Sequence, residues 1–327
     1  MELIFLGTSS GTPTKSRNVS GLALRRAGSR AWCLIDCGEG TQHRLLHTRL
    51  SPMQLDTLLI THVHGDHCYG LPGLLASAAL AGRTAPLRII APAPIAAFIE
   101  CVARLSDLRL DFPIDFVPVE SLQAPLAVQD FTLEAVALSH RVPSYAYVFT
   151  ETRVEAKLDV ARLTAEGIPA GPLWGRLHRG EELEFEGRRL RGQDYRLPAR
   201  APRKVIIAGD NDSPALLAEA ARGACLLVHE ATYTREVAER LGPAPQHSDA
   251  ERVARFAEQA GLPNLILTHF SPRYQDGAGS PHIDEIAAEA RAHYGGRLVL
   301  ARDLDHYRLS RQGELETAGP RRAGRQP

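Results

Sequence analysis

The heptapeptide Thr61-His62-Val63-His64-Gly65-Asp66-His67 directly follows the apolar stretch TLLI of residues 57–60. Four side chains of the kind that bind metal ions therefore crowd the end of one expected strand. In an extended chain residues i and i+2 project to the same side, so His62 and His64 can hold one cation together. Gly65 permits the tight turn that brings Asp66 and His67 to a second position close by. Burying these groups without a cation would be costly, so the segment predicts a metal site.

Three further expected strands also end in a histidine or an aspartate. EAVALS runs into His140, KVIIAG into Asp210, and LPNLILT into His269. The carboxyl ends of neighbouring strands meet at one edge of a sheet, so we expect these residues to join the heptapeptide. Five histidines and two aspartates exceed the needs of a single tetrahedral zinc ion, which predicts two metal ions that share a carboxylate. Imidazole and carboxylate without thiolate suit Zn²⁺, and Mn²⁺ or another divalent ion is compatible with them.

The composition of the whole chain is that of an ordinary soluble globular protein. The chain has 327 residues, of which 44% are hydrophobic and 23% charged, enough for one large α/β unit or two domains. Short apolar runs alternate with helical patterns, which favours a layered architecture. One expected helix covers Ser248–Gln259, with Ser248 as its N-cap and Glu251 three positions on. No apolar run is long enough to cross a bilayer and no signal peptide is evident, so we expect a cytoplasmic protein with no membrane partner.

Residues 151–203 break this rhythm. They contain GIPAGPLWGRL, then the acidic EELEFE, then RRLRGQDYRLPARAPRK. The glycine and proline pairs are turn signals, so we expect an inserted flexible arm that adds little to the main core of a single domain over 1–327. Between Arg188 and Lys204 there are seven basic residues against one acidic residue, although the whole chain has a net charge of +0. Such a charge run is ordinarily a solvated loop, and the alternative interpretation is a basic surface that binds RNA.

The motif HVHGDH, together with the downstream His140, Asp210 and His269, resembles the metallo-β-lactamase superfamily, which implies an αββα sandwich. Five further segments resemble the ribonuclease Z family of tRNA 3′-processing endonucleases within that superfamily. These are FLGTSSGTPTKSRN (5–18), IDCGEGTQ (35–42), GIPAGPLWGRL (167–177), HEAT (229–232) and HSD (247–249). The resemblance extends from Met1 to about residue 306.

The resemblance also implies a ligand set. One metal would be held by His62, His64, His140 and Asp210, and the other by Asp66, His67, Asp210 and His269. The family usually reads Gly-Asp-Thr where this chain reads Gly209-Asp210-Asn211-Asp212, so Asp212 adds a carboxylate that could compete for metal. We assign the bridging role to Asp210, because it stands at the strand end, and expect Asp212 to be a surface or N-cap residue before Pro214.

The resemblance further implies hydrolysis of precursor tRNA, in which a metal-activated hydroxide would attack a phosphodiester. Asp66 would act as ligand and base, His247 as general acid, and Glu230 as the group that orients His247. In the family the cut follows the unpaired nucleotide beside the acceptor stem and leaves a 3′-hydroxyl. The arm would clamp the tRNA, often from the partner subunit of a homodimer, and Lys15 and Arg17 would meet the acceptor end. The arm residues that we expect to bind substrate are Gly171, Pro172, Arg188, Arg189 and Arg191.

Two other functions are compatible with the same scaffold. A small-molecule hydrolase, such as a phosphodiesterase or an aryl sulfatase, would share the metal ligands but would have no use for a basic arm. A catalytically silent RNA-binding protein would keep the arm, but the full set of metal ligands argues against it.

Overall fold

The computed structural model describes residues 1–154, 157–197, 200–277 and 279–319, and the chain forms two compact units. The larger unit comprises Met1–Thr150 with Arg203–Pro327, and the smaller unit comprises Glu151–Pro202. Within the described residues, no helix is both long and apolar enough to cross a membrane.

The first sheet of the larger unit combines the N-terminal strands with two strands from the end of the chain. Its strands are β1 (Glu2–Gly7), β2 (Gly21–Arg25), β3 (Trp32–Ile35), β4 (Leu55–Leu59), β5 (Leu87–Ala91), β6 (Ile114–Pro118), β16 (His306–Leu309) and β17 (Leu315–Thr317). Their order is β17-β16-β1-β2-β3-β4-β5-β6. Strands β3 to β6 run parallel to one another, whereas β1 is antiparallel to both of its neighbours.

The second sheet carries most of the strand ends singled out by the sequence. Its strands are β7 (Leu126–Val128), β8 (Phe131–Leu138), β9 (Ser144–Glu151), β12 (Lys204–Ala208), β13 (Leu226–Glu230), β14 (Asn264–Thr268) and β15 (Arg297–Leu300). Their order is β15-β14-β13-β12-β9-β8-β7. Because β12, β13, β14 and β15 are parallel neighbours, their carboxyl ends share one edge of the sheet.

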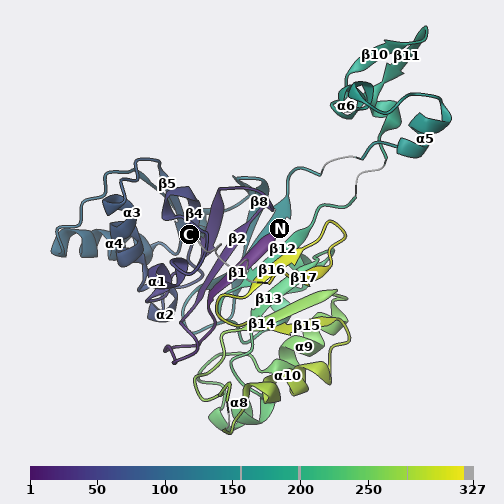
Figure 1. Cartoon of the computed structure of the whole chain (residues 1–327). Coiled ribbons are helices and arrows are strands. Elements are labelled where there is room, and N and C mark those ends of the chain that lie inside the picture. Colours follow the sequence, from purple (N-terminus) through teal and green to yellow (C-terminus); the bar gives the residue numbers. More distant parts are fainter. Residues whose placement is uncertain (155–156, 198–199, 278, 320–327) are drawn as a thin grey trace, which may run out of the picture. The chain divides into compact units, whose positions relative to one another are not determined.

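Helices cover the outer face of each sheet (Figure 1). They are α1 (Thr41–Leu45), α2 (Gly65–Cys68), α3 (Leu71–Leu80), α4 (Pro94–Leu105), α7 (Ala218–Ala221), α9 (Ala250–Gln259) and α10 (Ile283–Arg291). Helix α8 (Arg235–Leu241) has no buried residue and joins none of the cores. The alternation along β1 shows how the layers form: Leu3 and Phe5 join the core between the sheets, and Leu6 joins the core under α3 and α4. A third core lies between the second sheet and helices α9 and α10. The predicted αββα sandwich is therefore confirmed.

The expectation for the start of one helix was wrong. Helix α9 begins at Ala250, and its N-cap is Asp249, whose side chain accepts a hydrogen bond from the backbone N–H of Arg252. Ser248 instead donates its hydroxyl proton to the carbonyl of Asn211, at 2.6 Å. The turn expected at Gly65 is the first turn of α2, and glycine is needed there because a Cβ atom would collide with the ring of Tyr69.

The smaller unit has its own secondary structure, which the sequence pattern did not predict. It contains α5 (Val160–Ala165), α6 (Pro172–His178) and an antiparallel hairpin of β10 (Glu182–Phe185) and β11 (Arg188–Arg191). Six buried side chains form its core: Leu163, Ile168, Leu177, Leu183, Leu190 and Tyr195. None of them belongs to the three cores of the larger unit, as is expected for an insertion.

Candidate active site

The seven residues expected to bind metal lie together within the larger unit. His62, His64, His140 and Asp210 form one group of potential ligands, and Asp66, His67 and His269 form a second. Within each group the ligand atoms all lie within 4.8 Å of one another. Asp212 belongs to no such group among the described residues; its backbone N–H donates to the carbonyl of Ser139.

The first group brings three imidazole nitrogens to one oxygen of Asp210. His64 Nδ1 lies 3.1 Å from Nε2 of His62 and 3.1 Å from Nε2 of His140. Oδ2 of Asp210 lies 3.6 Å from His62 Nε2 and 3.8 Å from His140 Nε2. Ligands at about 2.0–2.1 Å from a tetrahedral ion are separated by about 3.3 Å, so these spacings fit one ion.

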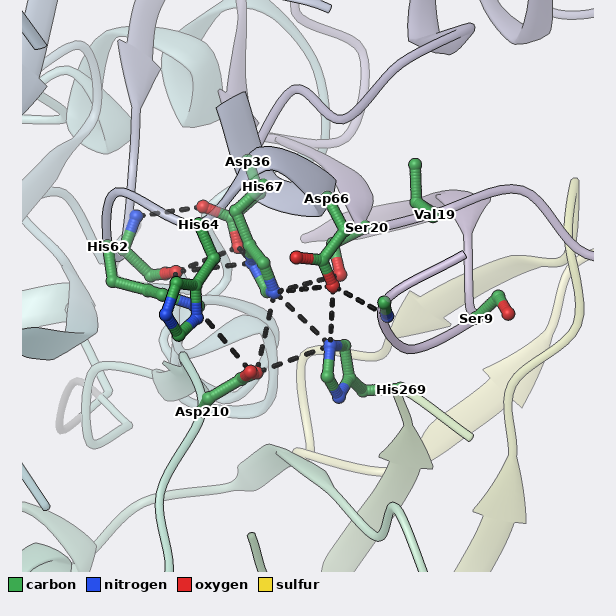
Figure 2. Close-up of polar contacts among 12 residues, drawn as sticks. Ser9, Val19, Ser20, Asp36, His62, His64, Asp66, His67, Asp210 and His269 are labelled. Carbon is green, nitrogen blue, oxygen red and sulfur yellow. Dashed lines mark hydrogen bonds and ion pairs between the residues drawn. The ribbon is translucent and has the colours of Figure 1, made fainter. Parts of the chain in front are cut away.

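The second group meets the other oxygen of the same carboxylate (Figure 2). Asp210 Oδ1 lies 3.5 Å from His67 Nε2 and 3.4 Å from His269 Nε2. The Nε2 atoms of His67 and His269 are 3.2 Å apart, and Oδ2 of Asp66 lies 3.3 Å from Nε2 of His269. Asp210 thus turns one oxygen to each group, which is the geometry of a carboxylate shared by two cations.

The pKa shifts of the clustered histidines favour the binding of cations. Burial, reinforced by neighbouring imidazoles, lowers the pKa of His62, His64 and His140, which favours the neutral form that binds metal. His67 differs: burial opposes its protonation, but Asp210, Asp36 and Asp66 raise its pKa well above the usual value. The carboxylates around His67 therefore make a site that favours positive charge, and its donor set fits a divalent metal ion.

Each of three histidines is oriented by a contact at its other ring nitrogen. Nδ1 of His67 lies 2.7 Å from Oδ2 of Asp36, and Nδ1 of His140 lies 2.8 Å from the carbonyl oxygen of Gln246. Nδ1 of His269 lies 3.1 Å from the hydroxyl oxygen of Thr232. Such contacts fix the tautomer and the ring orientation of a ligand.

Asp36 is the important residue that the sequence reasoning missed. It is 6% exposed, and its carboxylate also accepts hydrogen bonds from the backbone and the hydroxyl of Thr61. Its backbone is left-handed, with φ 59°, as is that of His269. Asp36 closes an expected strand in the same way as the ligands do, so the strand-end pattern could have found it. Positive φ at two non-glycine residues is the kind of strain that a functional site retains.

Gly209 lets the two sheets approach each other at the site. A Cβ atom at this position would lie 2.6 Å from Cβ of Thr61 and 2.8 Å from Oγ of Ser144. Glycine directly before Asp210 therefore allows the end of β12 to meet the chain segment that carries His62.

His247 and Glu230 form a pair beside the metal cluster. Nδ1 of His247 lies 3.0 Å from Oε1 of Glu230 and 3.7 Å from Oδ2 of Asp210. Glu230 is 1% exposed and also accepts from the backbone N–H of Asn211, at 2.8 Å. His229 is buried behind the site, and its Nδ1 donates to the carbonyl of Glu230 at 2.7 Å, so it is a packed core residue.

An open cavity of about 300 Å³ gives access to the cluster. Its lining includes His64, Asp66, Asp210, His247 and His269. Four of the potential ligands and His247 therefore border the same open space.

Lys15 and Arg17 are placed very differently. Lys15 is exposed, whereas Arg17 is 4% exposed. The guanidinium of Arg17 pairs with Asp276 at 2.7 Å and donates to the hydroxyl of Thr8 and the carbonyl of Ala301. Because these contacts hold the guanidinium inside the protein, the expectation that Arg17 meets RNA needs correction. Arg17 anchors the loop, and of the two residues Lys15 is the one exposed for contact with RNA.

The expected substrate-binding residues of the smaller unit lie on its surface. Gly171 and Pro172 form an exposed turn at the start of α6. On β11, Arg189 and Arg191 both pair with Glu182, and Arg188 donates to the carbonyl of Glu166. Residues 151–202 contain ten Lys and Arg against nine Asp and Glu, so the basic run is largely balanced within its own unit.

Comparisons with known proteins place the chain in a family. Residues 1–159 match the family model described as "Anti-Pycsar protein Apyc1". A ribonuclease Z of Pseudomonas putida is 56% identical over 321 residues, covering 97% of this chain and 100% of that protein. A ribonuclease Z of Marinobacter nauticus is 54% identical over 317 residues, covering 96% and 98%.

A solved structure shares the fold. The crystal structure of the human tRNase Z, short form, superposes with a TM-score of 0.66 at 24% identity, covering 95% of this chain and 100% of that one. With identities above half over nearly the full length of both sequences, the chain belongs to the ribonuclease Z family.

Proposed function

We propose that the protein is a metal-dependent endoribonuclease that removes the 3′ trailer of precursor tRNA. The observation that carries this proposal is the carboxylate of Asp210, which presents Oδ2 to His62 and His140 and Oδ1 to His67 and His269. The similarity to ribonuclease Z proteins over nearly the whole chain supports the choice of substrate.

We further propose that the two groups hold two divalent cations, Zn²⁺ by preference. His62, His64, His140 and Asp210 would hold one, and Asp66, His67, Asp210 and His269 the other. When bound, such ions lower the pKa of water and offset the charge of a phosphodiester.

Asp66 acts mainly as a ligand in this scheme. Its burial alone would raise the pKa of the carboxyl, but His67 and His269 hold that pKa far below its ordinary range. A carboxylate so stabilised is a poor proton acceptor, so the base role expected for it is secondary to its role as a ligand. Its Oδ2 also accepts from the backbone N–H of Gly11, at 2.7 Å, which fixes its orientation.

His247 supplies the proton for the leaving 3′-oxygen. Its Nδ1 faces Glu230, so Nε2 is the nitrogen left to donate to the substrate. Burial opposes protonation, but the carboxylate of Glu230 outweighs it and raises the pKa of His247 to about 9. The imidazole is therefore charged at neutral pH, as a general acid must be before transfer.

The smaller unit is proposed to bind the body of the tRNA. Folded RNA is recognised mainly through its shape, phosphates and 2′-hydroxyls, and the exposed arginines of β11 offer such contacts. A homodimer, in which one subunit's arm serves its partner, is part of the proposal and rests on the family resemblance; size-exclusion chromatography tests it.

The deciding experiment uses purified protein and a 3′-extended precursor tRNA, with and without added zinc. We expect one cut after the unpaired nucleotide beside the acceptor stem, leaving a 3′-hydroxyl on the tRNA and a 5′-phosphate on the trailer. Asp66→Ala protein, purified in the same way, controls for contaminating nucleases. Hydrolysis of small phosphodiesters without any cut in the tRNA would favour the small-molecule hydrolase instead.

A further inference from the structure

A second cavity adjoins the one above the metal cluster. Its volume is about 470 Å³, and both cavities are lined by Ser10, Gly11, Arg141 and His247. Tyr233 and Pro245 line the second cavity but not the cavity above the metal cluster. The two spaces therefore meet at Arg141 and His247.

The position of His247 decides what the second cavity can hold, given the proposed function. Cleavage that leaves a 3′-hydroxyl expels the 3′-oxygen of the upstream nucleotide, and this oxygen must face His247 to receive its proton. The nucleoside attached to that oxygen then needs room beyond His247, which the second cavity provides.

The charge of the second cavity suits a phosphate. Of the described residues that line it, none is acidic, and Arg141 and His247 are the basic ones. Arg141 is exposed and makes no hydrogen bond or ion pair within the described part of the chain. A third cavity, of about 580 Å³, also touches His247, but its lining is mixed in charge. Its arginines, Arg235, Arg252 and Arg255, are already paired with the carboxylates of Glu251 and Asp249, which line the same cavity.

Tyr233 offers a hydroxyl close to where the ribose would lie. Its ring meets that of His247 edge-on, with centroids 6.0 Å apart, and is only partly buried. Its hydroxyl has no hydrogen-bond partner among the residues that the structure describes. The ribose 2′-hydroxyl is the neighbour of the leaving 3′-oxygen, so a group beside His247 is well placed to contact it.

We propose that the second cavity binds the nucleotide that carries the leaving 3′-oxygen, with Arg141 pairing with its 5′-phosphate and Tyr233 bonding to its 2′-hydroxyl. The inference rests on the proposed function. It adds two residues that position the substrate without taking part in the proton transfer.

The test pairs Arg141→Gln with a precursor tRNA that carries one neutral methylphosphonate in place of that 5′-phosphate. On unmodified RNA we expect kcat/KM of the variant to fall about 10- to 100-fold, mostly through KM, as for a lost charged hydrogen bond. The kcat/KM of wild-type protein should fall by a similar factor when the modified RNA replaces the unmodified RNA. The kcat/KM of Arg141→Gln should fall little further on the modified RNA, because the contact is already absent. Independent effects that multiply, or full wild-type activity on the modified RNA, would overturn the proposal.

The same design applies to Tyr233→Phe and a 2′-deoxy substitution at that nucleotide. The losses in kcat/KM from the two changes should again be non-additive, and additive losses would count against the contact.

Arg109→Gln, at a side chain that is 84% exposed, is the matched control and should cleave like wild type. Bound metal should be unchanged in Arg141→Gln; its loss would make Arg141 part of the metal site and reject the subsite. If wild-type protein fails to cut the unmodified RNA, the proposed function itself is wrong.

Discussion

Nδ1 of His247 lies 3.0 Å from Oε1 and 3.1 Å from Oε2 of Glu230, so one buried carboxylate holds the imidazole with both oxygens. Burial works against the charge on Glu230, yet the pKa of this carboxyl is lowered to about 2, mainly by His247. The pair is therefore an ion pair at neutral pH. His247 belongs to neither proposed ligand set, although its ring lies within 4.8 Å of ligand atoms of Asp210 and His269.

The first prediction concerns His247 as the general acid. His247→Ala should slow cleavage of precursor tRNA by about 10²- to 10⁴-fold, because an alkoxide is a poor leaving group without a proton. Hydrolysis of bis(p-nitrophenyl) phosphate should fall much less, since nitrophenolate departs unprotonated. Rates on both substrates and the zinc content of the variant check this. Lost metal, or equal losses on the two substrates, would show that His247 has another role.

The second prediction concerns Asp36, whose carboxylate contacts His67 at Nδ1, the ring nitrogen that faces away from the proposed metal. Asp36→Asn should weaken metal affinity by about 10- to 100-fold, because the histidine loses the charge that orients it and raises its basicity. Competition with a chelator measures the affinity. Asp107→Asn, at a side chain that is 86% exposed, is the matched control. Unchanged affinity in Asp36→Asn would mean that the contact only stabilises the fold.

The third prediction separates chemistry from binding at Asp66. Asp66→Ala should abolish cleavage, since a proposed ligand is lost, while the protein still binds precursor tRNA through other surfaces. Single-turnover cleavage and filter binding measure the two properties. A chelator should have the same effect on wild-type protein, and added Zn²⁺ should restore it. Turnover at the wild-type rate in the variant would refute the assignment.

The candidate metal ligands could be located from the sequence because each of them lies at, or shortly after, the end of an expected strand. Once β12 and β14 are neighbours of β13 in a parallel array, Asp210 and His269 must lie at one edge. The roles as metal ligands stay predictions, since they depend on ions. The strand-end pattern could have drawn attention to Asp36 as well, but not to its contact with His67, which depends on the directions of two side chains 31 residues apart.

Other features could not be read from the pattern. The core of the smaller unit consists of six side chains scattered over residues 163–195, too few for a clear periodicity. Strand β17 has only three residues, too short a run for an alternating pattern to reveal its pairing with β16. The burial of Arg17 depends on Asp276, far along the chain, so a local charge count misjudges it.

The fourth prediction concerns the smaller unit. Lys204 of β12 pairs with Thr150 of β9, so the chain can be closed by a short Gly-Ser turn in place of residues 151–202. The three cores of the larger unit keep all their side chains in this deletion. We expect kcat/KM for precursor tRNA to collapse while bis(p-nitrophenyl) phosphate turnover survives. If tRNA cleavage persists, the smaller unit does not bind substrate.

The fifth prediction concerns the buried guanidinium of Arg17. Burial alone would raise the pKa of the Asp276 carboxyl, but hydrogen bonds from Arg17 and Ser16 lower it. A carboxyl with a lowered pKa in the folded state stabilises the protein above the unfolded pKa, near 3.9, and loses this contribution as the pH falls below it. Asp276→Asn should therefore be less stable than wild type at pH 7 and approach it below about pH 3.

The expected loss at pH 7 is about 1 kcal/mol, because Asp276 is 27% exposed and solvent screens the pair, while Arg17 at 4% exposure is left without its anion. Denaturant unfolding at pH 7 and pH 3 measures it. Lys15→Ala is the control from the same loop: it should leave stability unchanged at both pH values and weaken only the binding of precursor tRNA. A difference between Asp276→Asn and wild type that does not shrink in acid would show that Arg17 is held by its other contacts, with Thr8 and Ala301, rather than by charge.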